Sequence, residues 1–297
     1  DLQICTFWLA ANVPLRTYTM RAAPTKDWTN ASLSFYASTA GGNGAYQVDS
    51  VTLNHAPAEL ALTALCGDPT APAPASGTNS GNLLSNGTFG NGSTNWGTFA
   101  QPTAGMTQRV SGGVFEFQRA TTATSAVVLQ NSGDSLASGL PIEAQFQLGN
   151  SSALRKRITV ILHDSDWSDL QVCTFWLPSN APLGNYVMRA FTTEAWTAAH
   201  ISFYASSADS AGWYRIDNVS LLRRPALDVN GTECYLPGSA PAGVAFGLDA
   251  PLIAAPTLLA TATAFPYSAP ALPAEQPLVA TPSALSESAP GEGTSSE

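Results

Sequence analysis

An acidic stretch with the sequence HDSDWSD, at residues 163–169, has the highest density of metal-binding side chains in this chain. Asp164, Asp166 and Asp169 could offer carboxylate oxygens to calcium, a hard cation that takes about six to eight oxygen ligands. The spacing is not that of an EF-hand loop, because the glycine and the final glutamate are missing. The alternative is a polar turn between strands, in which the aspartates accept hydrogen bonds from backbone amides.

Paired carboxylates also hydrolyse glycosides, provided that the two groups lie about 5–10 Å apart across a substrate cleft. Nothing in the sequence marks such a pair, and the three histidines are scattered. The sequence contains no G-x-S-x-G, H-E-x-x-H or P-loop motif. We therefore expect no catalytic residues in this chain.

Aromatic rings and planar amides are better candidates for a binding site. Sugars pack their C–H faces on flat rings and exchange hydrogen bonds with amides and charged groups. The residues of these types that fall at strand ends, in turns or on polar strand faces are Trp213, Tyr214, Trp167, Gln145, Gln147 and Arg157. We interpret them as a candidate glycan groove, with burial in a structural core as the alternative.

The elements that position these residues occur twice. Residues 1–53 align without a gap with residues 169–221, so that DLQICTFWL matches DLQVCTFWL and LSFYAS matches ISFYAS. A repeat of this length indicates tandem globular domains. Trp213 aligns with Ala45, so the fold does not require the ring, and we rank Trp213 first among the glycan-binding candidates.

The repeat also divides the chain. We expect residues 1–66 to be the C-terminal half of a domain, with four strands and no opposing sheet, and residues 82–235 to be a complete domain. The Pro, Gly and Ser content of residues 67–81 is typical of a linker, and that of residues 236–297 of a disordered tail. We also expect the chain to be part of a longer protein, within which it is a monomeric module.

Alternation of apolar and polar residues predicts strands throughout the complete domain. In residues 142–148, Ile142, Ala144, Phe146 and Leu148 share one face. Further strands are predicted at residues 114–118, 158–162, 183–190, 201–205 and 214–221, with turns between them and no helix. The predicted fold is all-β, an antiparallel β-sandwich of the jelly-roll type.

The four cysteines repeat with the domain. Cys66 follows Cys5, and Cys234 follows Cys173, at the same distance of 61 positions. This equality predicts a disulfide in each copy, Cys173–Cys234 in the complete one, with buried free thiols as the alternative. A disulfide indicates an oxidising compartment, so we expect a secreted or cell-surface protein.

Charge and hydropathy exclude two classes of partner. The net charge of −9 would repel a nucleic-acid phosphate backbone. No apolar run reaches the eighteen or so residues of a membrane span.

The complete domain resembles carbohydrate-binding modules of the family 4/9 type, which are galactose-binding-like jelly rolls. The resemblance lies in the opening NLLSNGTF…W at residues 82–96 and in the closing strand WYRIDNVSLL at residues 213–222. It implies a structural calcium bound in part by Asp217. The family commonly has an acidic residue after the opening phenylalanine, whereas Gly90 stands there and offers only its carbonyl oxygen. Apart from this calcium, no cofactor is expected.

Three functions are consistent with this pattern. The chain could be a non-catalytic module that binds a polysaccharide, a structural or adhesive repeat without a sugar site, or an accessory domain of a glycoside hydrolase. The fold alone does not distinguish them.

Overall fold

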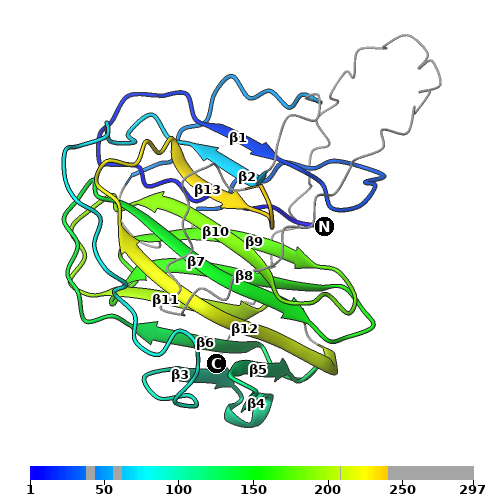
Figure 1. The fold of residues 1–297 in the computed structure, drawn as a ribbon. Helices are drawn as coiled ribbons and strands as arrows, with labels where there is room; N and C mark the ends of the chain where they lie inside the picture. The colour runs from blue at the N-terminus through cyan, green and yellow to red at the C-terminus, as the bar shows by residue number, and fades with distance from the viewer. Residues whose placement is uncertain (38–43, 56–61, 208, 240–297) are drawn as a thin grey trace, which may run out of the picture. The chain divides into compact units, whose positions relative to one another are not determined.

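The computed structural model describes residues 1–37, 44–55, 62–207 and 209–239. These residues form two antiparallel sheets, with no α-helix among them (Figure 1). The expected disordered tail at residues 236–297 lies, from residue 240 on, outside the described residues. The all-β antiparallel sandwich predicted from the sequence is confirmed.

The larger described sheet has eight strands. In spatial order they are β1 (Thr19–Ala22), β2 (Leu62–Gly67), β13 (Gly231–Tyr235), β10 (Gly184–Phe191), β7 (Pro141–Asn150), β12 (Asp209–Arg223), β5 (Val114–Arg119) and β4 (Met106–Ser111). The smaller described sheet has five, in the order β3 (Gly97–Gln101), β6 (Ser125–Asn131), β11 (Ala199–Ala205), β8 (Lys156–Asp164) and β9 (Leu170–Leu177). A 3-10 turn, η1 (Thr103–Gly105), precedes β4. The six strands predicted above correspond to β5, β7, β8, β10, β11 and β12.

The core lies between the two sheets, and the predicted alternation builds it. Because neighbouring side chains of a strand point to opposite faces, every second residue of β7 enters the core. Phe146 packs edge-on against Phe175 of β9 and Phe203 of β11, with ring centroids 5.8 and 5.4 Å apart. All three rings are fully buried. The intervening residues of β7 therefore face outwards.

Each copy of the repeat carries a disulfide. Cys173 of β9 is bonded to Cys234 of β13, and Cys5 is bonded to Cys66 of β2, with Cα atoms 5.7 and 5.5 Å apart. The predicted Cys173–Cys234 bond is confirmed. It links the two sheets, because β9 and β13 belong to different sheets.

The first copy joins the complete domain through equivalent strands. β2 and β13 are counterparts in the repeat, and they pair antiparallel. Leu65 lies opposite Glu233, which is its own counterpart in the repeat. On either side of this pair the partners exchange: Cys66 lies opposite Thr232, the counterpart of Ala64, and Ala64 lies opposite Cys234, the counterpart of Cys66. This pairing has the symmetry of an approximate two-fold axis. It extends the larger sheet by β2 and β1.

Where four strands were expected in the first copy, its described residues form two, β1 and β2. In the complete domain, β9 pairs with β8, β11 pairs with β6 and β8, and β12 pairs with β5 and β7. All of these partners come from the segment 82–168, for which the first copy has no counterpart in this chain. Without a neighbour to accept its hydrogen bonds, a sequence with strand periodicity does not become a strand. β1 and β2 remain because they pair with each other.

Candidate functional site

The outer face of the larger sheet has a row of accessible polar side chains on three neighbouring strands. Asn185 of β10 lies opposite Gln147 of β7, which lies opposite Asp217 of β12. Gln147 donates a hydrogen bond to Asn185 at 2.8 Å and accepts one from Asn218 at 2.9 Å. These four residues, which we call the amide row, are half-buried except for the exposed Asn185. They present planar donors and acceptors to solvent.

Trp213 lies on the same face of β12 as Asp217, because Tyr214 and Ile216 alternate with them and enter the core. The Trp213 ring is half-buried, and the guanidinium of Arg109 on β4 lies 4.3 Å from its centroid. A cation over a ring face at this distance is an attractive arrangement. Trp213 and the amide row therefore provide a ring and polar groups on one face.

The charged side chains of this face largely form ion pairs with one another. Glu116 accepts hydrogen bonds from Arg109 at 2.6 Å and from Arg215 at 2.9 Å. Glu143 accepts from Arg189 and from Arg224, each at 2.8 Å. Two carboxylates held in this way are poorly suited to the general acid and nucleophile roles of a glycosidase.

Burial raises the pKa of Asp217, and a hydrogen bond from the amide of Asn218 opposes this effect. The backbone of Asn218 has a positive φ of 49°, at an irregularity in the pairing of β12 with β7. Asparagine tolerates this region better than most residues. The irregularity lets the Asn218 side chain reach Gln147.

The structure brings together only part of the predicted glycan groove. Gln147 and Trp213 share the outer face of the larger sheet. Gln145 lies on that face but is buried, and it donates a hydrogen bond to Glu143 at 2.8 Å. Tyr214 is fully buried, and its hydroxyl donates to the carbonyl of Arg157 at 2.9 Å. The structure therefore places Tyr214 in the core.

The two remaining candidates lie on the other sheet. Arg157 is on β8, with its guanidinium 5.7 Å from the ring of Trp176. Trp167 is in the turn after β8, exposed and stacked on His163 at 3.6 Å between centroids. β7 and β8 follow each other in the sequence but belong to different sheets, which separates Arg157 from Gln145 and Gln147.

The acidic stretch forms a hydrogen-bonded turn. Burial acts to raise the pKa of Asp164, but hydrogen bonds from the amides of Ala198, Thr197 and Ser165 outweigh it and lower the pKa to about 2. Asp166 binds the amide of Ser168 at 2.9 Å. Asp164 ends β8 in the smaller sheet and Asp166 lies in the turn after it, whereas Asp217 lies on β12 in the larger sheet.

Within the described part of the chain, no group of three or more His, Cys, Asp and Glu side chains could hold a metal ion. The predicted calcium ligands Asp164, Asp166 and Asp217 are therefore not brought together.

We expect the stability of the protein to fall between pH 6.5 and pH 4 because of His163. The pKa of this ring is lowered to about 4, mainly because the ring is buried. The nearby His200 also lowers the pKa, whereas a hydrogen bond to the carbonyl of Asp164 acts to raise it. The folded pKa lies below the usual 6.5, so the stability is fully present above pH 6.5 and is lost as the pH falls. Lowering the pH from 7 to 4.5 is expected to reduce the free energy of unfolding by about 2 kcal/mol through this residue.

Urea unfolding of the protein and of the variant His163→Gln, at both pH values, tests this expectation. The variant should lose about 2 kcal/mol less between the two pH values than the unmodified protein. Equal losses would show that His163 does not control this pH dependence.

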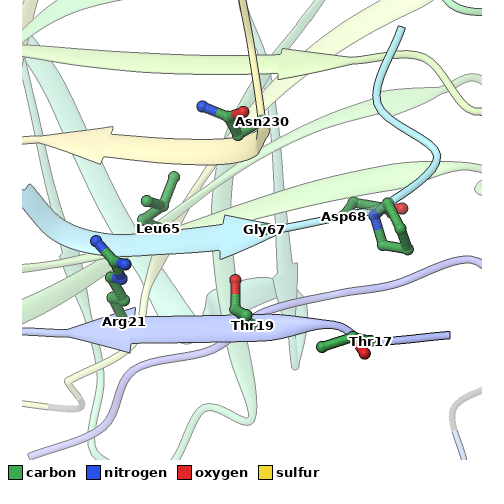
Figure 2. A pocket seen from close by; sticks show the side chains of 8 residues that line it. Thr17, Thr19, Arg21, Leu65, Gly67, Asp68 and Asn230 are labelled. Carbon is green, nitrogen blue, oxygen red and sulfur yellow. The ribbon is translucent and has the colours of Figure 1, made fainter.

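One pocket of about 370 Å³ lies between β1, β2 and the start of β13 (Figure 2). Its lining residues are Thr17, Thr19, Arg21, Leu65, Gly67, Asp68, Pro69 and Asn230. This lining contains no aromatic ring on which a sugar could stack. The pocket is therefore a weaker candidate for glycan binding than Trp213 and the amide row.

Sequence reasoning did not find Asn185, Asn218 and Arg109. Asn185 lies beside Gln147 only because β10 pairs with β7 in this register. Arg109 reaches the site only because β4 pairs with β5. Nothing local in the sequence marks those pairings. The Asp-Asn pair before Val219, which is typical of a turn, was the one signal for an irregular backbone in β12.

No protein-family model matches the chain, and no curated protein matches it in sequence. Among solved structures, a CBM4 module is similar at 17% identity and a TM-score of 0.40, over 47% of this chain and 99% of the module. A CBM61 module in complex with β-1,4-galactotriose is similar at 16% identity and a TM-score of 0.37, over 48% and 99%. An arabinose-bound α-L-arabinofuranosidase is similar at 13% identity and a TM-score of 0.40, over 56% of this chain and 32% of that enzyme. Similarity at this level assigns the chain to no family.

Proposed function

We propose that the chain is a non-catalytic module that binds a polysaccharide on the outer face of its larger sheet. The observation that carries the proposal is the accessible combination of the Trp213 ring with the amide row on that face. The ring would stack on a sugar face, and the amides with Asp217 would exchange hydrogen bonds with hydroxyls. The resemblance of residues 82–96 and 213–222 to family 4/9 modules supports the same function.

The pairing of the charged groups supports a binding role over a catalytic one. Glu116 and Glu143 are each held in ion pairs with two arginines. Such carboxylates are suited to a fixed surface rather than to proton transfer.

We further propose that the module acts outside the reducing interior of a cell. The two disulfides support this location, because structural disulfides persist in oxidising compartments. No helix in the described residues is long and apolar enough to cross a membrane.

Replacing Trp213 by alanine is expected to weaken polysaccharide binding about three- to tenfold, which is the effect of losing one stacked ring. The fold should tolerate the change, because the Trp213 ring is half-buried on the outer face of the larger sheet and not part of the core. Loss of the Arg109 contact should reduce the free energy of unfolding by no more than about 1 kcal/mol. Affinity electrophoresis in gels that contain single polysaccharides measures the binding, and a thermal melt measures the stability.

Phe99→Ala is the matched control for this experiment. Phe99 is 55% exposed and lies on β3, in the smaller sheet, so its removal also deletes an accessible ring. Binding should be unchanged in this variant. Equal retardation of Trp213→Ala and the unmodified protein, in a polysaccharide that retards both, would place the binding site elsewhere.

A second function is a structural repeat without a sugar site. The pairing of β2 with β13 favours it, because this contact joins two copies of the repeat into one continuous sheet. If no polysaccharide retards the unmodified protein, this second function becomes the better explanation of the structure.

A further inference from the structure

The first copy exposes the residues that form the core of the complete domain. Eight of its apolar side chains are 38–63% exposed: Met20, Trp28, Leu33, Phe35, Tyr46, Val48, Val51 and Leu53. Their counterparts are at most 2% exposed: Met188, Trp196, Ile201, Phe203, Tyr214, Ile216, Val219 and Leu221. Exposed apolar surface of this extent marks an interaction site.

The segment 82–168 covers these positions in the complete domain. It supplies β3, β4, β5, β6, β7 and β8, and β5 to β8 are the strands that pair with the counterparts of the first copy's unpaired stretches. Phe203, for example, packs against Phe146 of β7, whereas its counterpart Phe35 is 63% exposed. The first copy thus lacks one specific set of strands.

The first copy nevertheless retains several local contacts that the complete domain also has. Asp1 accepts hydrogen bonds from Thr25 and from the indole of Trp28, as Asp169 does from Thr193 and Trp196. The rings of Phe7 and Tyr18 lie 4.9 Å apart, and their counterparts Phe175 and Tyr186 lie 5.0 Å apart. The disulfide is equivalent as well. These local contacts are therefore retained, whereas the contacts with a segment of the 82–168 type are missing.

The position of one arginine also indicates that a segment of the 82–168 type binds here. Arg189 of β10 forms an ion pair with Glu143 of β7 at 2.8 Å. Its counterpart Arg21 is exposed on β1, the outermost described strand of the larger sheet, and none of the ion pairs of the described residues includes it. Figure 2 shows Arg21 beside Leu65 at this edge. A strand like β7, added beside β1, would bring a glutamate to Arg21.

We propose that the described residues of the first copy, 1–37, 44–55 and 62–66, form a docking site for a second segment with the sequence of residues 82–168. The added β7-like strand would continue the larger sheet beyond β1, and the added β6- and β8-like strands would flank residues 31–37. Main-chain hydrogen bonds would provide affinity, as in other cases of strand addition, and the apolar positions would provide register. The result would be two complete domains related by the β2–β13 contact. This inference does not depend on the proposed polysaccharide binding.

The test is a chain in which a second copy of residues 82–168 is joined in front of Asp1. Its last residue, Ser168, then meets Asp1 as it meets Asp169 in the natural sequence. Hydrogen exchange followed by mass spectrometry is measured on this chain and on the unmodified one. Amides of residues 31–37 and 44–55 should become protected at least about a thousandfold, as expected for a stable domain. Binding of an apolar dye should decrease.

The control carries Phe146→Asp in the added copy only. This change places a charge where the added ring would meet Phe7, Tyr18 and Phe35, whereas the original domain keeps its own Phe146. Protection of residues 31–37 and 44–55 should be lost in the control and residues 199–205 should stay protected.

Absence of protection at residues 31–37 and 44–55 in the extended chain, with residues 199–205 protected, would overturn the proposal. Protection already present in the unmodified chain, together with a dimer in light scattering, would also overturn it, because a second copy of the whole chain would then occupy the site.

Discussion

Replacing Trp196 by alanine is expected to reduce the free energy of unfolding by about 3–5 kcal/mol. The ring is 1% exposed, and its indole N–H donates a 2.7 Å hydrogen bond to the carboxylate of Asp169. The substitution leaves a large cavity in the core. It also removes a donor from a buried carboxylate, which costs additional stability. Urea unfolding followed by tyrosine and tryptophan fluorescence measures the loss.

Trp28→Ala provides a matched control within the same chain. The indole of Trp28 donates a 2.8 Å hydrogen bond to Asp1, so the local contact is the same, but the ring is 39% exposed. We expect a loss of less than about 1 kcal/mol, because little apolar surface leaves a buried environment. Similar losses for the two variants would contradict the packing difference between the copies.

Removing the disulfide of the complete domain, with Cys173→Ala and Cys234→Ala together, is expected to reduce the free energy of unfolding by about 4 kcal/mol. The bond closes a loop with a sequence separation of 61, and a loop of that size restricts the unfolded chain by about this amount. It also joins β9 to β13 across the core, where both cysteines are fully buried. Guanidinium unfolding at pH 7 measures the change.

The double variant Cys5→Ala and Cys66→Ala tests whether loop length alone accounts for the effect. Its loop has the same separation of 61, but the loop contains the first copy's exposed apolar residues. We expect the main unfolding transition to shift by less than about 1 kcal/mol, because most of this loop gains little from folding. Equal shifts for both pairs, or thiols that react with iodoacetamide in the folded unmodified protein, would contradict this account.

The sequence by itself was sufficient for the fold class and for individual strands. Alternation in residues 142–148 placed Ile142 and Phe146 in the core, because side-chain direction along a strand depends only on the parity of the position. The repeat also predicted the Cys173–Cys234 disulfide, since equal spacing in two copies reports a shared three-dimensional constraint.

Only the tertiary structure decided which strands are neighbours. Gln147 meets Asn185 and Asp217 because β7 lies between β10 and β12, whereas Arg157 of the next strand along the chain lies in the other sheet. Strand order depends on pairing between distant segments, and local periodicity contains no information about it. The predicted groove was therefore divided between two sheets.

The first copy shows the same limit most directly. Residues 31–37 read ASLSFYA, close to the AHISFYA of β11, yet they form no strand here. The amino acids determine where such a stretch can pair and which face it would bury. Whether it becomes a strand depends on neighbours that satisfy its backbone hydrogen bonds and cover its apolar face, and those neighbours belong to the tertiary structure.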